Sequence, residues 1–168
     1  MRELAPPRRV VTGHDSMGRG TFTADGQPPF TRQLADGAIF HELWSTLTSP
    51  APIGVVQPEA VRPGDPLPPP FGGSRLRVVD IPPGAESPMH RTESIDYGVV
   101  LEGWIVLRLD TGEVSLGPGD VVIQRGSDHA WENRGAEPAR ILFVLLSGRF
   151  DDAMRALVPS DGLTHDME

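Results

Sequence analysis

The sequence predicts an all-β protein, built as an antiparallel barrel or sandwich of short strands. From Arg75 onward, short runs of aliphatic and β-branched residues alternate with turn signals made of glycine, proline and aspartate. Strand-sized runs at this spacing, with a turn between each pair, are typical of antiparallel barrels. Only residues 151–157 read as a helix, and it is a short one near the C-terminus.

The first 73 residues are rich in proline and glycine and contain two plausible strands, at residues 8–12 and 38–46. Residues 57–73 hold a dense run of prolines. Proline lacks a backbone N–H and breaks both helices and central strands, so this segment is expected to run as an extended surface loop. We expect residues 1–73 to pack on the barrel as a β extension or to swap between subunits.

Residues 74–147 form the expected barrel core, and residues 148–168 form the short helix and a tail. The core contains five strand-like runs, at residues 76–81, 97–101, 104–109, 121–124 and 140–146. In one run, Ile105 and Leu107 alternate with Trp104 and Val106. If the aliphatic set fills the barrel, Trp104 faces outward, which suggests a subunit interface and a homodimer.

Composition excludes several chemistries. The chain has no cysteine, and all fifteen of its basic residues are arginine, so disulfides, thiolate nucleophiles, zinc–thiolate sites and lysine Schiff bases are ruled out. The net charge is −8 with no positive stripe, so no nucleic-acid partner is expected. The sequence shows no signal peptide and no apolar run approaching the ~18 residues that span a bilayer. We therefore expect a cytoplasmic protein with no membrane partner.

A first pattern of potential ligands follows the strand at residues 76–81. Five residues separate Gly84 from His90, Thr92 follows two positions later, and Asp96 and Gly103 come next along the chain. On an extended chain, residues two apart share a face, so His90 and Thr92 are expected to point the same way.

A second pattern follows on what we expect to be a neighbouring hairpin of the same sheet. It contains Gly119, Gln124, Gly126, His129 and Asn133. His129 is therefore the second histidine with patterned surroundings. We expect it to lie near the first histidine, inside the barrel.

Together the two patterns resemble the motifs of the cupin superfamily, over about residues 74–147. The family's first motif holds a glycine, a His-x-His pair, a glutamate and a closing glycine, and here Thr92 stands at the second histidine and Asp96 at the glutamate. In the second motif, Gln124 replaces a proline and the stretch before it is one residue shorter. The resemblance implies a cupin, or jelly-roll, antiparallel β-barrel of the single-domain conserved-barrel type with a degenerate first motif.

The resemblance also implies a divalent metal inside the barrel. His90, Asp96 and His129 would form a two-histidine, one-carboxylate set, which suits iron, zinc or manganese. A threonine hydroxyl is a poor replacement for a ligand imidazole, so a site without metal is the alternative. The same groups would then be a metal-free acid–base cluster, with Asp96 orienting a histidine, or would line a barrel that only binds.

Four further residues are candidates for substrate binding. Trp131 shares a face with His129 and could stack on a flat ligand or fill the core. Thr92 points inward beside His90. Gln124 and Arg125 lie at the rim of the hairpin, where one could anchor a carboxylate, although an arginine in solvent is the simpler interpretation of Arg125.

The candidate residues and the resemblance together predict an enzyme that acts on a small molecule. The chain is expected to be a cupin enzyme acting on a small aromatic or carbonyl-bearing metabolite of secondary metabolism. His129, His90 and Asp96 would be its catalytic residues, in lyase-type chemistry (decarboxylation, dehydration or cyclisation) or as an oxygenase with iron. The alternative is a non-catalytic cupin that binds a small molecule without metal, and a structural homodimer without ligand is a third hypothesis.

Overall fold

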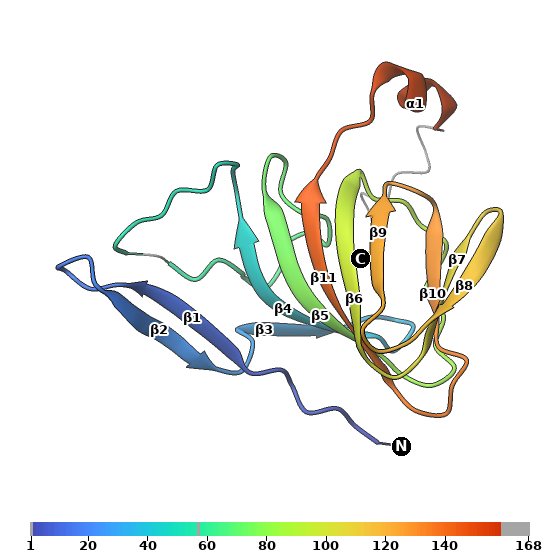
Figure 1. Ribbon diagram of the computed structural model, residues 1–168, viewed down its shortest axis with the longest axis horizontal. Helices are drawn as coiled ribbons and strands as arrows, with labels where there is room; N and C mark the ends of the chain where they lie inside the picture. The colour runs from blue at the N-terminus through green and yellow to red at the C-terminus, as the bar shows by residue number, and fades with distance from the viewer. Residues whose placement is uncertain (1, 57, 159–168) are drawn as a thin grey trace.

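The computed structural model describes residues 2–56 and 58–158. These residues form eleven strands and one helix (Figure 1). The strands are β1 (Arg9–His14), β2 (Gly20–Gly26), β3 (Phe30–Gln33), β4 (Ile39–Thr46), β5 (Ser74–Ile81), β6 (Ser94–Glu102), β7 (Ile105–Leu109), β8 (Gly112–Leu116), β9 (Val121–Arg125), β10 (His129–Glu132) and β11 (Ala139–Ser147), and the helix is α1 (Asp152–Leu157).

Two antiparallel sheets build the barrel. The larger sheet has the strand order β3-β4-β5-β11-β6-β9, and the smaller has the order β10-β7-β8. Strands β1 and β2 pair only with each other, in a hairpin that projects to one side of the larger sheet (Figure 1). The expected all-β architecture of antiparallel sheets, with an N-terminal β extension and a short C-terminal helix, is therefore confirmed.

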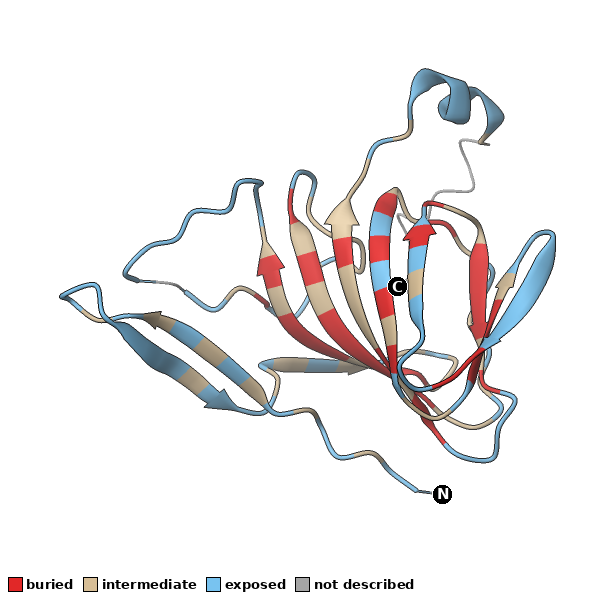
Figure 2. Ribbon diagram, viewed as in Figure 1, coloured by how far each residue is buried: buried red, intermediate tan, exposed pale blue. Residues whose placement is uncertain are grey.

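The core lies between the two sheets, where their inward side chains meet. Ile105 and Leu107 of β7 pack with Val79, Val100 and Ile141 of the larger sheet, and all five are nearly inaccessible to solvent. Buried and exposed residues alternate along β6, as the period of a half-buried strand requires (Figure 2). Trp104 is 67% exposed, so it faces outward as the alternation predicted.

The expected strands all exist, but four others were missed. β3 and β10 have only four residues each, and β2 and β8 are almost wholly exposed, so these two lack the alternation of apolar residues that marks a half-buried strand. The helix α1 starts after Asp151, whose side chain accepts a hydrogen bond from the amide of Met154. No helix in the described part of the chain is long and apolar enough to cross a membrane.

The expectation that both histidine patterns lie in one sheet is wrong. Asp96 lies on β6 in the larger sheet, whereas His129 begins β10 in the smaller sheet. The chain crosses between the sheets at Gly126, which adopts a left-handed conformation with φ of +63°. His90 precedes β6 and forms an isolated bridge with His129, so it belongs to the same side of the barrel as β10.

Candidate functional site

His90 and His129 are directly paired across an antiparallel bridge. The backbone amide of each donates a hydrogen bond to the carbonyl of the other, at 2.9 Å in both directions. Side chains of such a pair project from the same face of the bridge. The two imidazole rings accordingly lie side by side, with their centroids 4.0 Å apart.

Backbone carbonyls fix the proton on each imidazole. The Nδ1 atom of His90 is 2.8 Å from the carbonyl oxygen of Pro88, and that of His129 is 3.0 Å from the carbonyl oxygen of Ser127. A carbonyl can only accept, so Nδ1 carries the proton in both rings and Nε2 keeps its lone pair. This arrangement is the one by which proteins orient histidines that ligate metals.

Both imidazoles are held in the neutral form. Burial lowers the pKa of His90, although the carbonyl of Pro88 opposes that shift. Burial, together with the proximity of His90, lowers the pKa of His129 to about 3. At neutral pH the pair therefore presents two uncharged nitrogen ligands or two bases.

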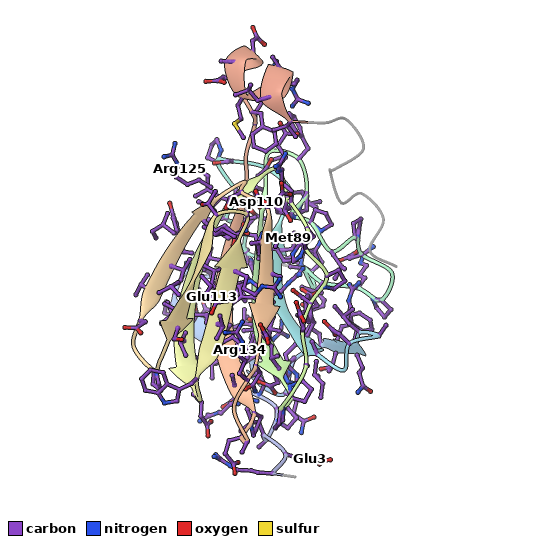
Figure 3. All side chains as sticks on the ribbon, turned by 90° about the vertical axis from the view of Figure 1, so that its right-hand side faces the viewer. Glu3, Met89, Asp110, Glu113, Arg125 and Arg134 are labelled. Atoms are coloured by element: carbon purple, nitrogen blue, oxygen red, sulfur yellow. The ribbon has the colours of Figure 1, made fainter. Side chains whose placement is uncertain are left out.

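Both histidines line one cavity of about 380 Å³ between the sheets. Its lining includes five of the residues that the sequence singled out: His90, Thr92, Asp96, His129 and Trp131. The other two candidates lie outside this lining. Gln124 is buried behind His129, and Arg125 is exposed on the outside of the barrel (Figure 3).

Gln124 contacts the ring of His129. Its Nε2 atom lies 2.6 Å from Nδ1 and 3.0 Å from Nε2 of the imidazole. Its Oε1 atom is buried and has no hydrogen-bond partner among the described residues. With the proton of His129 on Nδ1, the amide N–H of Gln124 donates to Nε2 of this ring, so a ligand at that nitrogen has to displace this hydrogen bond.

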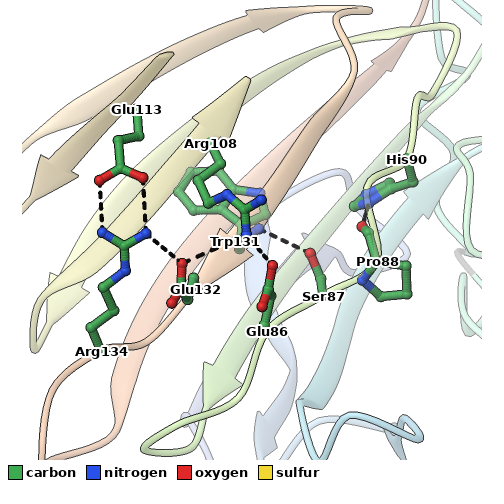
Figure 4. A network of polar contacts seen from close by, with 9 residues as sticks. All are labelled: Glu86, Ser87, Pro88, His90, Arg108, Glu113, Trp131, Glu132 and Arg134. Carbon is green, nitrogen blue, oxygen red and sulfur yellow. Dashed lines mark hydrogen bonds and ion pairs between the residues drawn. The ribbon is translucent and has the colours of Figure 1, made fainter. Parts of the chain in front are cut away.

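Trp131 forms one wall of the cavity. Its ring meets Phe143 edge-on with centroids 5.4 Å apart, and it lies 6.5 Å from the ring of His129. The hydroxyl of Ser87 accepts a hydrogen bond from the backbone amide of Trp131 (Figure 4). Beside it, Glu132 of β10 pairs with Arg108 of β7, and Arg134, which follows β10, pairs with Glu113 of β8, so these ion pairs tie β10 to the rest of its sheet (Figure 4).

Asp96 is the carboxylate of this cavity on the opposite sheet. It is buried, and its Oδ1 atom accepts a hydrogen bond of 2.6 Å from the hydroxyl of Ser94. Burial raises the pKa of Asp96 to about 6, against the opposing effects of Ser94 and Arg77. A buried carboxyl with such a pKa can hold or release a proton near neutral pH.

His90 and His129 are suited to bind a metal because they are two neutral imidazoles already held side by side. In the part of the chain that the structure describes, no group of three histidine, aspartate or glutamate side chains is already gathered around one point. His90 and His129 nevertheless line one cavity with Asp96, as two neutral imidazoles and one carboxyl group. Neutral imidazoles with a carboxylate suit iron, zinc or manganese.

Sequence reasoning missed a second polar group in the barrel, a cluster of Arg32, Glu42, Arg75 and Arg77. Glu42 is completely buried, with Nη2 of Arg77 at 3.2 Å and nitrogens of Arg32 and Arg75 at 3.7 Å. Arg32 and Arg77 also line the cavity. The available signal was the spacing of Arg75 and Arg77, two apart in a strand whose other residues are mostly apolar.

Comparison with known proteins agrees with this architecture. The sequence profile described as the cupin domain matches residues 77–145. The chain is 44% identical to the phomopsin biosynthesis cluster protein C' of Diaporthe leptostromiformis over 158 residues, which cover 88% of this chain and 82% of that protein. It is 41% identical to the cupin-domain-containing oxidoreductase fogC of Aspergillus ruber, over 82% of this chain and 71% of that protein.

Among solved structures, the cupin domain of Cnp3 from Schizosaccharomyces pombe has the same fold. It superposes with a TM-score of 0.53 at 15% identity, covering 94% of this chain and 99% of that one. This likeness concerns the arrangement of the strands alone.

Proposed function

The chain belongs to the cupin-domain family, and on that premise we propose that it is a metal-dependent cupin oxidoreductase acting on a small aromatic or carbonyl-bearing metabolite. The observation that carries the proposal is the pair His90 and His129, two neutral imidazoles that lie side by side in one cavity with Nδ1 of each bonded to a backbone carbonyl. Of the two chemistries that the sequence left open, the names of several relatives support the redox one over the lyase one.

In this proposal His90 and His129 hold the metal, and Asp96 provides the third ligand. A bound iron would supply one-electron redox chemistry with dioxygen as the oxidant. Trp131 and Phe143 hold the apolar part of the substrate and exclude water from the site. Without metal, Asp96 is the group that can hold or release a proton beside the histidines.

A second candidate is a cupin that binds a small molecule without turnover. The observation in its favour is Thr92, which lines the cavity where a third imidazole would complete a metal site. Such a protein needs the apolar walls and the hydrogen-bonding groups of the cavity but no metal.

Metal content separates the two candidates. We would measure iron, zinc and manganese by plasma mass spectrometry in untagged wild type, His90→Ala and His129→Ala. His14→Ala is the matched control because His14 is exposed at the end of β1. The proposal expects near-stoichiometric metal in wild type and control, loss in both cavity variants, and tighter binding in Thr92→His.

The opposite result would be equally informative. If wild type takes up no metal after incubation with each ion, while the histidine variants remain folded, the metalloenzyme proposal fails. The binding protein without metal would then be the remaining candidate.

The proposed setting is a biosynthetic pathway for a secondary metabolite, in the cytoplasm. The names of relatives from biosynthesis clusters support the pathway. A homodimer is proposed as well, because the outer face of β6 and β9 exposes Tyr97, Val121 and Ile123. Sedimentation velocity would test the dimer.

A further inference from the structure

We propose that the substrate of this cavity is a small apolar carboxylic acid and that Arg77, helped by Arg32, binds its carboxylate. The inference rests on the proposed function, because it takes the same cavity as the substrate chamber. It adds a recognition element on the wall opposite the histidines, made by side chains that the proposed chemistry does not use.

The first support is that three buried or half-buried arginines share one close carboxylate, Glu42. Three guanidinium groups approach this one carboxylate, with distances of 3.2 Å from Arg77 and 3.7 Å from Arg32 and Arg75. Asp65 lies at 4.0 Å from Arg75, and Asp96 attracts Arg77 at longer range. Among the described residues, Glu42 is therefore the only carboxylate within 4.0 Å of Arg32 and Arg77, and a further anion between these two guanidinium groups would pair with charge that Glu42 has to share.

The second support is a set of hydrogen bonds that are not made. Arg77 is 4% exposed, and its Nε atom has no hydrogen-bond partner among the described residues. The same holds, within those residues, for Nε of Arg32 and for both carboxylate oxygens of Glu42. The guanidinium groups are thus close to Glu42 but badly aligned with it, and buried groups in this state call for a partner.

The third support is position. Arg77 and Arg32 line the cavity, and the Arg77 guanidinium lies 5.0 Å from the ring centroid of Phe40. In the sheet, Arg77 is paired with Phe143, and β6 with Asp96 lies one strand further on. Two strand spacings are about 10 Å, which leaves room for an apolar group between a carboxylate at Arg77 and the part of the cavity beside β6.

Both arginines also hold the proline-rich loop that closes this side of the cavity. Nη2 of Arg32 donates to the carbonyl of Asp65 at 2.8 Å, and Nη2 of Arg77 donates to the carbonyl of Leu67 at 2.6 Å. A guanidinium has five N–H donors, so these contacts leave donors for an acid. If the arginines served only the loop, the charge of a ligand would not affect its binding.

Matched acids and amides test the inference. We would titrate the purified protein by calorimetry with benzoate and 3-phenylpropanoate, and with the neutral isosteres benzamide and 3-phenylpropanamide. Charge-assisted hydrogen bonds to a guanidinium should make the acids bind about tenfold more tightly than the amides. Glu42→Gln should increase that preference, because it removes the carboxylate that competes for Arg77.

The preference should disappear in the double variant Glu42→Gln/Arg77→Gln, which removes one charge of each sign. If that variant does not fold, as judged by near-UV circular dichroism, Arg32→Gln takes its place and should weaken the binding of the acids severalfold. Arg134→Gln, a change at an exposed arginine, is the control and should leave all four affinities unchanged.

Two results would overturn the inference: equal affinity of wild type for acids and amides, or a preference that survives in the folded arginine variants and is lost in His129→Ala. The latter would mean that the carboxylate binds at the histidines. A protein that takes up metal but shows no preference for acids refutes this inference alone. A protein without metal that prefers acids through Arg77 refutes only the proposed function.

Discussion

The two sides of the cavity bury their polar groups differently: the side of β10 buries neutral imidazoles, and the side of β4 and β5 buries a carboxylate among arginines. On the side of β10, His90 and His129 are neutral, and their N–H groups are satisfied by backbone carbonyls. On the side of β4 and β5, Glu42 lies among three guanidinium groups, with hydrogen bonds unmade among the described residues. The neutral wall is therefore suited to a cation and the charged wall to an anion, and a substrate chamber needs both.

The largest expected effect comes from breaking the charged wall. Glu42→Ala removes the carboxylate that the three guanidinium groups share, and uncompensated buried charge should lower the free energy of unfolding by about 3–5 kcal/mol. Urea denaturation followed by circular dichroism measures it. Glu113→Ala, which breaks an exposed pair with Arg134, should change stability little.

If Glu42→Ala were as stable as the control, Glu42 would not be needed to compensate the charge of the three arginines around it. A rise in stability on adding benzoate to the folded variant would, in contrast, support the view that an external carboxylate can replace Glu42.

Asp80 is a carboxylate of the same sheet that, unlike Glu42, accepts hydrogen bonds on both of its oxygens. Asp80 accepts hydrogen bonds from Nε and Nη2 of Arg140 at 2.6 Å and from Nε2 of His41 at 2.9 Å. Burial acts to raise the pKa of Asp80, but the hydrogen bonds from Arg140 and His41 outweigh it and hold the pKa below its ordinary value of 3.8. Asp80→Asn should therefore cost about 1.5–3 kcal/mol at neutral pH.

The pH dependence of this cost has a definite sign. Because the pKa is lower in the folded state, the stabilisation is complete above the ordinary value of 3.8 and is lost as pH falls through the folded value. The difference in stability between wild type and Asp80→Asn should shrink in acid. A constant difference from neutral pH to the acid limit would contradict the role given to Asp80.

The smallest of these effects concerns the neutral wall. Gln124→Leu removes the amide N–H that competes for the lone pair on Nε2 of His129 and should therefore tighten metal binding about severalfold, with little loss of stability. Competition with a fluorescent chelator measures the affinity. Arg125→Ala, at the next position but exposed, is the control, and equal affinities in the two variants would remove Gln124 from the site.

The sequence alone predicted the architecture and the histidine side of the cavity but not the arginine side. The reason is that the two sides leave different patterns in the sequence. Histidines at motif spacing stand out because they are few and chemically distinctive. Arg75, Arg77 and Glu42 went unnoticed because charged residues on strands are normally in solvent, and only the pairing of β4 with β5 shows that they face inward together. The crossing at Gly126 was also invisible, since a turn signal does not reveal which sheet the chain enters.

The state of the two imidazoles is the most direct test of this account. Long-range ¹⁵N–¹H NMR of the histidine rings reports both the tautomer and the pKa. We expect His90 and His129 to be neutral with the proton on Nδ1 at pH 7, and His129 to stay neutral until the pH approaches its pKa of about 3. Added Zn²⁺ should shift both Nε2 signals. Protons on Nε2, or charged rings at pH 7, would contradict it.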